Sequence, residues 1–175
     1  MGNPLNNRIA GFLFLLMVLV SLVYSNTLFA PFNYDDELVI KTEIKENFHE
    51  GSDSLYYFSF YPPRYRHLFY LSLAFNYSHG ELNPLGYHLV NIFFHFLTSL
   101  VVFFITFITI TRGMLWEKKV ACSIAIITTL FFALNPVQSE TVNYISARAV
   151  GMSSFFYLLA LLFFILGSFS EPSVM

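Results

Sequence analysis

Three consecutive carboxylates, Asp35, Asp36 and Glu37, are the residues of this sequence best suited to acid–base chemistry. They directly follow a long apolar segment, so they would lie at the mouth of a membrane helix. Mutual repulsion beside a low-dielectric surface is expected to raise the pKa of at least one of them. Such a carboxylate can take a proton from a hydroxyl group. The alternative is a solvated acidic flank that keeps the helix from sliding inward.

Two arginines, Arg64 and Arg66, lie in a segment rich in tyrosine and phenylalanine, residues 55–70. Aromatic rings at this density suit the headgroup layer of a membrane. The preceding prolines predict that an interfacial helix opens after them, over about Arg64–Asn76. Guanidinium groups bind phosphate in a bidentate fork, so the pair could clamp the phosphate of a lipid substrate. Ordinary lipid anchoring is the alternative.

Polar side chains also interrupt a long apolar segment at His88, Asn91 and His95. Their spacing places them on one helix face. Such residues face a cavity or form hydrogen bonds between helices. A metal site would need further ligands, because the two histidines are two turns apart. We therefore expect no cofactor; a divalent metal could bind here, but nothing in the sequence indicates one.

A second polar segment begins at Asn135 and Pro136, which resemble a helix cap followed by the first helical residue. If the helix continues, Glu140, Tyr144 and Arg148 form one polar stripe. Glu140 and Arg148 are too far apart for a direct ion pair at that spacing, so each needs another partner. Arg148 either reaches lipid phosphate or contacts the first acidic segment across the site.

The composition limits the classes of protein that can carry these residues. Of 175 residues, 56% are hydrophobic and 11% are charged, with a net charge of −2. This composition excludes a disordered chain and a nucleic-acid binder. The single cysteine excludes a disulfide framework and a paired-cysteine metal site. A membrane protein remains.

The apolar segments predict an all-α integral membrane protein with about four transmembrane helices, and residues 1–175 would form only part of a membrane domain. A spanning helix needs about 20 apolar residues, and the third segment is short. The first segment could instead be a signal peptide, although Ser25–Thr27 is a poor cleavage site and apolar residues continue beyond it. The predicted spans are residues 9–30, 87–111, 120–136 and 152–169.

The basic residues near the spans predict the orientation. Short loops rich in lysine and arginine remain in the cytoplasm, and Arg8, Arg112, Lys118 and Lys119 flank the spans on one side. We therefore expect a multi-pass protein with both termini in the cytoplasm. Residues 31–86, which include the interfacial helix, and residues 137–151 would form the extracytoplasmic loops.

Taken in order, these motifs resemble the amino-terminal part of the polytopic glycosyltransferases with the C-type fold. The resemblance is strongest to the transmembrane and tetratricopeptide-repeat O-mannosyltransferase-like proteins and their bacterial relatives. The residues that carry it are 34–37, 64–66, 84–91 with His95, 135–142 and 145–149.

The resemblance implies transfer of a sugar from a polyprenyl-phosphate donor to a hydroxyl of a protein or glycan, on the extracytoplasmic face. It places the catalytic base at Asp35 or Asp36. The candidate substrate-binding residues are Glu37, Arg64, Arg66, His88, Asn91, Glu140 and Arg148. Family members have more spans and helical repeats, whereas a 34-residue repeat is absent here. We therefore expect the chain to be inactive alone, with the remaining spans of a split or truncated enzyme as a partner.

Two other classes stay open. A non-catalytic membrane module that binds lipid or a partner membrane protein would also explain four spans. A small transporter or channel is disfavoured, because such proteins usually need an ionisable residue in mid-span, and the predicted spans have no charged residue.

Overall fold

The computed structural model describes residues 4–45 and 66–169, and the regular structure within these ranges is helical. Three of the described helices are long and apolar enough to cross a membrane: Pro4–Val23, Pro84–Gly113 and Ile145–Ser168. The helix at the position of the third predicted span, Lys118–Ala133, has 16 residues. It is about 24 Å long and is shorter than an ordinary span. An all-helical membrane protein is confirmed, and a fourth span stays a prediction.

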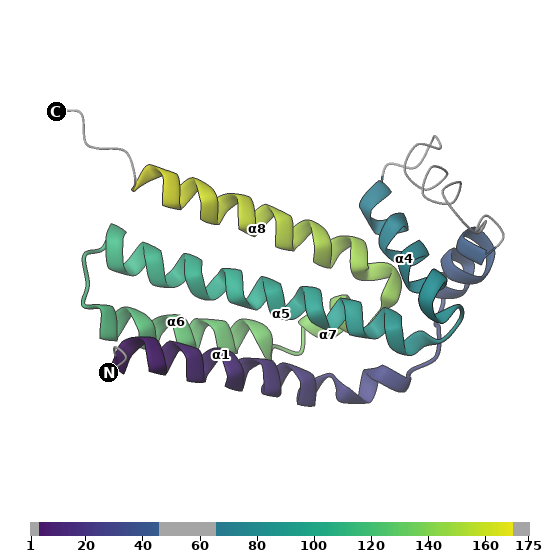
Figure 1. Cartoon of the computed structure of the whole chain (residues 1–175), viewed down its shortest axis with the longest axis horizontal. Coiled ribbons are helices and arrows are strands. Elements are labelled where there is room, and N and C mark those ends of the chain that lie inside the picture. The colour runs from purple at the N-terminus through teal and green to yellow at the C-terminus, as the bar shows by residue number, and fades with distance from the viewer. Residues whose placement is uncertain (1–3, 46–65, 170–175) are drawn as a thin grey trace. The chain divides into compact units, whose positions relative to one another are not determined.

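The helical elements in chain order are shown in Figure 1. They are α1 (Pro4–Val23), the 3₁₀-helix η1 (Ser25–Phe29), the π-helix η2 (Glu37–Ile44), α4 (His67–Gly80), α5 (Pro84–Ile108), the π-helix η3 (Thr109–Gly113), α6 (Lys118–Ala133), α7 (Gln138–Asn143), the 3₁₀-helix η4 (Ile145–Ala147) and α8 (Arg148–Ser168).

The chain forms two compact units. The first unit comprises residues 1–23, 93–138 and 153–175, and the second unit comprises residues 24–92 and 139–152.

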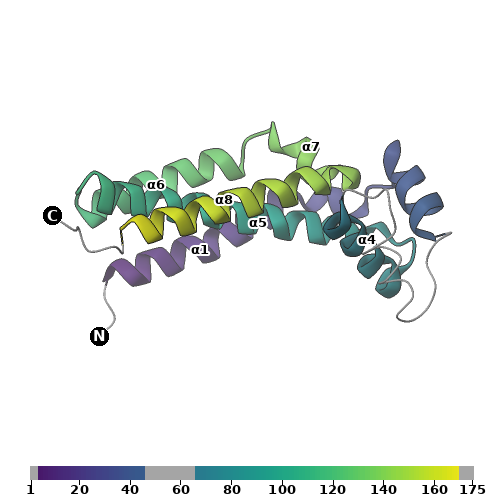
Figure 2. The ribbon, with the colours of Figure 1, turned by 90° about the horizontal axis from the view of Figure 1, so that it is seen from above.

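In the first unit, α1, α6 and the parts of α5 and α8 that belong to it run lengthwise beside one another (Figures 1 and 2). Phe12 of α1 contacts Phe103 of α5, with ring centroids 5.3 Å apart. Phe94 of α5 contacts Phe155 of α8 in the same way, at 5.8 Å. Small side chains let apolar helices approach closely, and α6 buries five of them: Ala121, Cys122, Ala125, Thr129 and Ala133.

In the second unit, η2 and α4 pack against each other around a small apolar core. The residues of each element lie about one turn apart, so they share a face. Burying each large apolar side chain stabilises the fold by about 1.5–3 kcal/mol relative to exposure to water. The core consists of Ile40, Ile44, Phe69, Leu73, Ala74, Tyr87 and Ile145.

Several helix ends differ from the sequence prediction. The first helix ends at Val23 instead of residue 30, and a 3₁₀-helix follows it. The predicted interfacial helix corresponds to α4, although Arg64 lies outside the described residues. The helix expected to begin at Pro136 begins two residues later, because Asn135 Oδ1 accepts a hydrogen bond from the Val137 N–H at 3.0 Å and closes a turn there.

The predicted stripe of Glu140, Tyr144 and Arg148 on one helix is wrong. Helix α7 ends at Asn143, and Tyr144 has an extended backbone with φ −91° and ψ 117°. This residue breaks the helical register between α7 and α8. The three residues therefore belong to different elements and do not share one helix face.

Candidate functional site

The two aspartates that follow η1 have different environments in the second unit. Asp36 is 1% exposed, and its Oδ1 accepts hydrogen bonds from the backbone N–H and the hydroxyl of Ser146, both at 2.7 Å. Two short charge-assisted bonds hold a carboxylate firmly and satisfy it in a buried place. Asp36 is therefore fixed to η4, the 3₁₀-helix that contains Ser146.

Asp35, by contrast, presents an exposed side chain. Its backbone N–H donates to the Tyr144 hydroxyl at 3.2 Å, which fixes the main chain beneath the carboxylate. Partial burial raises the pKa of Tyr144, and the neighbouring carboxylates of Asp35 and Asp36 raise it further. Tyr144 therefore remains a neutral hydroxyl at physiological pH. An exposed carboxylate on a fixed backbone has the geometry that a general base needs.

Arg148 is 1% exposed and fully engaged with protein groups. Its Nε donates to Asn91 Oδ1 and its Nη2 to the Tyr87 carbonyl, both at 2.8 Å. Its Nη1 donates to Asn76 Oδ1 at 2.8 Å and to Ser72 Oγ at 3.1 Å. The guanidinium also lies 5.8 Å from the centroid of the Tyr87 ring. Snorkelling to lipid phosphate, one sequence interpretation of Arg148, is not what the structure shows.

The partners of Arg148 are neutral groups, which is unusual for a buried cation. The Asp36 carboxylate is close enough to interact with the guanidinium electrostatically. Among the described residues Arg148 forms no ion pair with Asp36, so the second alternative from the sequence, a contact of Arg148 with the first acidic segment, stays a prediction. Arg148 joins α4, α5 and the start of α8 through its hydrogen bonds.

Asn91 is buried and connects Arg148 to the segment that precedes it. Its Nδ2 donates to the carbonyls of Val142 at 3.2 Å and Tyr144 at 3.1 Å, while its Oδ1 accepts from Arg148. A side-chain amide can do both at once. Asn91 therefore holds the extended residue Tyr144 between α7 and η4.

Two more bonds fix the segment on the amino-terminal side of the aspartates. His88 Nε2 lies 3.1 Å from the Ala30 carbonyl, and since a carbonyl can only accept, the proton is on Nε2. The Thr27 hydroxyl donates to Asn143 Oδ1 at 2.7 Å. Residues 27–36 are thus held by α5 on one side and by residues 142–148 on the other.

The structure brings together only some of the residues that the sequence singled out. Asp35, Asp36, His88, Asn91 and Arg148 belong to one network. His95 belongs to the first unit, where its Nε2 donates to the Ala133 carbonyl at 3.0 Å. Within the described ranges, no three histidine, cysteine, aspartate or glutamate side chains gather as metal ligands would.

Other candidates stand apart from this network. Glu37 is exposed and forms an ion pair with Lys41. Glu140 on α7 and Arg66 before α4 are exposed. Their substrate-binding roles, like those of the network residues, stay predictions. Arg64 lies outside the described residues.

Sequence reasoning did not single out Ser146, Asn76, Ser72 or Thr27. Each is a small polar residue in a mostly apolar neighbourhood, and that was the available signal. Their partners lie far away in the sequence: Ser146 and Asp36 are 110 positions apart, and Asn76 and Arg148 are 72 positions apart. A local pattern does not reveal such pairs.

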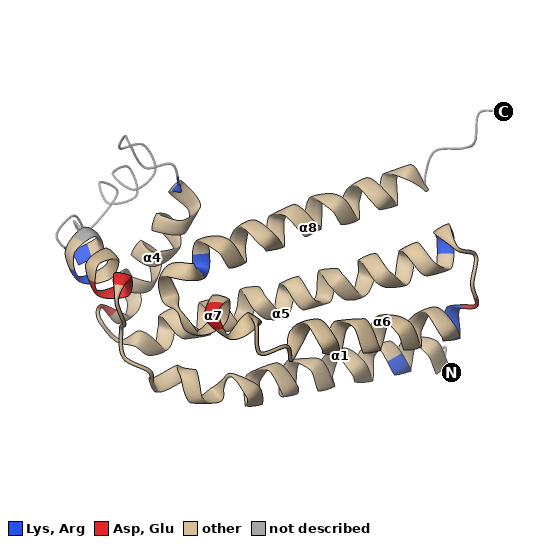
Figure 3. Cartoon of the chain, turned by 180° about the vertical axis from the view of Figure 1, so that it is seen from behind, with Lys and Arg blue, Asp and Glu red and all other residues tan. Residues whose placement is uncertain are grey.

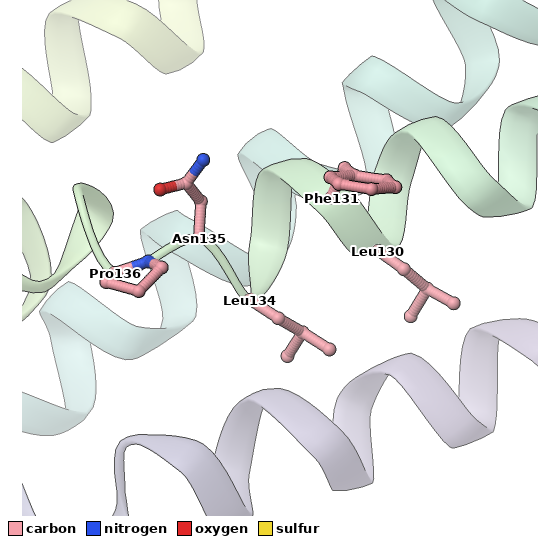
Figure 4. A pocket seen from close by; sticks show the side chains of 5 residues that line it. All are labelled: Leu130, Phe131, Leu134, Asn135 and Pro136. Carbon is pink, nitrogen blue, oxygen red and sulfur yellow. The ribbon is translucent and has the colours of Figure 1, made fainter.

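A shallow apolar pocket of about 400 Å³ lies in the first unit at the end of α6 (Figure 4). Leu130 and Leu134 project toward α1, and Phe131 projects away from it. No candidate catalytic residue lines the pocket. Its lining residues are Leu130, Phe131, Leu134, Asn135 and Pro136.

Fold and site together define a helical membrane protein with one exposed carboxylate on a hydrogen-bonded support. Comparison with known proteins adds the family. The chain is 30% identical to the protein O-mannosyl-transferase TMTC3 of Homo sapiens over 159 residues, which cover 85% of this chain and 16% of that protein. It is 34% identical to human TMTC2 over 152 residues, and 35% identical to tmtc2 of Xenopus laevis over 151 residues.

The chain is therefore a homologue of the TMTC O-mannosyl-transferases, which confirms the resemblance seen in the sequence. It spans about a sixth of the length of these relatives, 16% to 17%. No protein-family model matches the chain. No solved structure matches it either.

Proposed function

We propose that this chain is part of a glycosyltransferase that transfers mannose from a polyprenyl-phosphate donor to a hydroxyl acceptor on the extracytoplasmic face of a membrane. The observation that carries the proposal is the contrast between the two aspartates. The carboxylate of Asp35 is exposed, whereas that of Asp36 is buried and accepts two hydrogen bonds from Ser146. The family relationship supplies the reaction class, since the relatives are named O-mannosyl-transferases.

In this reaction Asp35 is the base. Its carboxylate takes the proton of the acceptor hydroxyl as that oxygen attacks the anomeric carbon of the sugar. The bond from this carbon to the donor phosphate breaks, and the phosphate leaves with the bonding electron pair. Asp36 does not take the proton, because both hydrogen bonds from Ser146 would be weakened if it were protonated. Asp36 instead positions the backbone of its neighbour.

The leaving lipid phosphate needs a positive partner, and Arg66 is a candidate. It is exposed immediately before α4, the helix that corresponds to the predicted interfacial helix. A guanidinium at the headgroup layer can neutralise phosphate through paired hydrogen bonds. Arg148 acts differently, because its bonds to Asn76, Asn91 and Tyr87 hold it inside the protein.

The test is a chimera in which residues of this chain replace the matched segment of human TMTC3. Transfer of radiolabelled mannose from polyprenyl-phosphate mannose to an acceptor protein is measured in membranes. We expect Asp35→Asn to lower the rate at least 100-fold with unchanged thermal stability. Asp36→Asn should lower both rate and stability. Glu81→Gln, another exposed acid of the second unit, is the matched control and should change neither.

If Asp35→Asn keeps the full rate, Asp35 is not the base. If the chimera binds polyprenyl phosphate but never transfers sugar while unmodified TMTC3 does, a non-catalytic membrane module, the second candidate, is favoured.

A further inference from the structure

The loop between η3 and α6, residues 114–117, presents three large apolar side chains to the surroundings. Met114, Leu115 and Trp116 are 57%, 84% and 52% exposed. The loop has a definite backbone, because the Met114 N–H donates to the Thr109 carbonyl at 3.1 Å and the Trp116 N–H to the Ile110 carbonyl at 3.2 Å. The apolar side chains are thus held outward.

Leu115 also has a strained backbone. Its φ of 58° lies in the left-handed region, which leucine rarely adopts. Strain of this kind persists where the surrounding structure imposes it, and it is frequent at functional sites. Here the strained residue has the most exposed of the three apolar side chains.

Basic residues surround this loop at one end of the first unit. Arg112 precedes it, and Lys118 and Lys119 follow it in the first turn of α6. Arg8 of α1 reaches the same end, since its Nη2 donates to Ser123 of α6 at 3.4 Å. Figure 3 shows Lys and Arg gathered where η3, α6 and α1 approach one another.

These positive charges form no ion pair within the described ranges, residues 4–45 and 66–169, although Glu117 lies within the loop. Two lysines in the first turn of α6 also oppose the positive end of the helix dipole. The arrangement is therefore complementary to an external anion.

We propose that this end of the first unit binds the headgroups of anionic phospholipids, with Met114, Leu115 and Trp116 inserted at the boundary between headgroups and acyl chains. Amphipathic surfaces that combine basic residues with Trp and Leu bind membranes in this way. The inference does not rest on the proposed transferase activity. It concerns the direct recognition of lipid charge, beyond the general bias that orients basic loops.

Trp116 is the single tryptophan of the chain, so its fluorescence reports on this loop alone. The 175-residue chain is reconstituted in nanodiscs of phosphatidylcholine with 20% phosphatidylglycerol. In one sample only the phosphatidylglycerol carries bromine, which quenches tryptophan on contact. In the other sample an equal fraction of phosphatidylcholine is brominated. We expect brominated phosphatidylglycerol to quench Trp116 more strongly than brominated phosphatidylcholine does. We also expect the emission maximum of Trp116 to be shifted to the blue relative to tryptophan in water.

Two kinds of variant separate charge from apolar insertion. In Lys118→Gln/Lys119→Gln, the preference for anionic lipid should fall at least tenfold, while the emission maximum stays blue-shifted. Leu115→Asn tolerates the left-handed backbone but removes the apolar side chain, so quenching by both lipids should fall. Lys45→Gln is the control, an exposed lysine of the second unit, and should change nothing.

Equal quenching by the two brominated lipids in the unsubstituted chain would overturn the proposal. Emission typical of water, without quenching, would also overturn it and would favour an acidic protein surface as the partner. If the double variant fails to fold by circular dichroism, 1 M salt replaces it, since salt should abolish the preference by screening the lysines.

Discussion

Asp36 and Ser146 lie 110 residues apart in the sequence, yet one oxygen of the Asp36 carboxylate accepts two hydrogen bonds of 2.7 Å from Ser146. This contact joins the segment after η1 to the turn between α7 and α8. It fixes the backbone from which the neighbouring Asp35 projects. Asp36 therefore fixes the backbone, whereas its neighbour Asp35 provides the proposed catalytic carboxylate.

Ser146→Ala should destabilise the protein by about 1.5–3 kcal/mol, because the buried Asp36 carboxylate loses the charge-assisted hydrogen bond from the Ser146 hydroxyl. Thermal unfolding in detergent measures the effect. Ser139→Ala, at an exposed serine of the same unit, is the matched control and should leave the melting temperature unchanged. Equal melting temperatures for both variants would contradict the importance of the contact.

Arg148→Lys should destabilise the protein by about 3–5 kcal/mol despite keeping the charge. An ammonium group cannot reach Asn76, Asn91 and the Tyr87 carbonyl at once, so buried acceptors lose their partners. Limited proteolysis and thermal unfolding detect the change. Arg66→Lys, at an exposed arginine, should have no effect on either measurement, and a stable Arg148→Lys protein would show that the network tolerates an ammonium.

Tyr144→Phe should lower stability by about 1 kcal/mol at pH 7, since the Asp35 N–H loses its acceptor. The pKa of Tyr144 is raised from 10.0 in the folded chain. The stabilisation that the protonated Tyr144 hydroxyl contributes is therefore fully present below pH 10. It is lost as the pH rises through the pKa of Tyr144 in the folded chain. The difference in free energy of unfolding between Tyr144→Phe and the unsubstituted chain should become smaller above pH 10. A difference that widens there would contradict the raised pKa.

Cysteine labelling tests the predicted orientation. Cys122 is the single cysteine of the sequence and is fully buried, so the parent chain should not react with a membrane-impermeant maleimide. Glu81→Cys, in the predicted outer loop, should react in intact cells. Arg112→Cys should react only after permeabilisation. The reverse labelling pattern would show that the protein has the opposite orientation in the membrane.

Much of the fold could be predicted from local pattern. The apolar segments around α1, α5 and α8 indicate helices long enough to cross a membrane, because hydropathy is a property of consecutive residues. The prediction failed where the main chain turns. Periodicity predicted that Glu140, Tyr144 and Arg148 share one polar helix face. The helix is interrupted at Tyr144, because Asn91 holds the carbonyl of this residue.

Within the candidate site, residue type alone identified the acidic pair and the buried face of α5. It could not separate Asp35 from Asp36, because adjacent residues of one type have the same local sequence. Nor could it show that Arg148 has neutral partners inside the protein.

The sequence by itself therefore determined that this is a helical membrane protein related to the O-mannosyl-transferases, and that its acidic pair is the best candidate for chemistry. Only the tertiary structure decided which aspartate is exposed and which is buried. The physical reason is that burial and hydrogen bonding of these groups depend on Ser146, Asn91 and Asn76. These residues are brought together by folding across distances that no local pattern encodes.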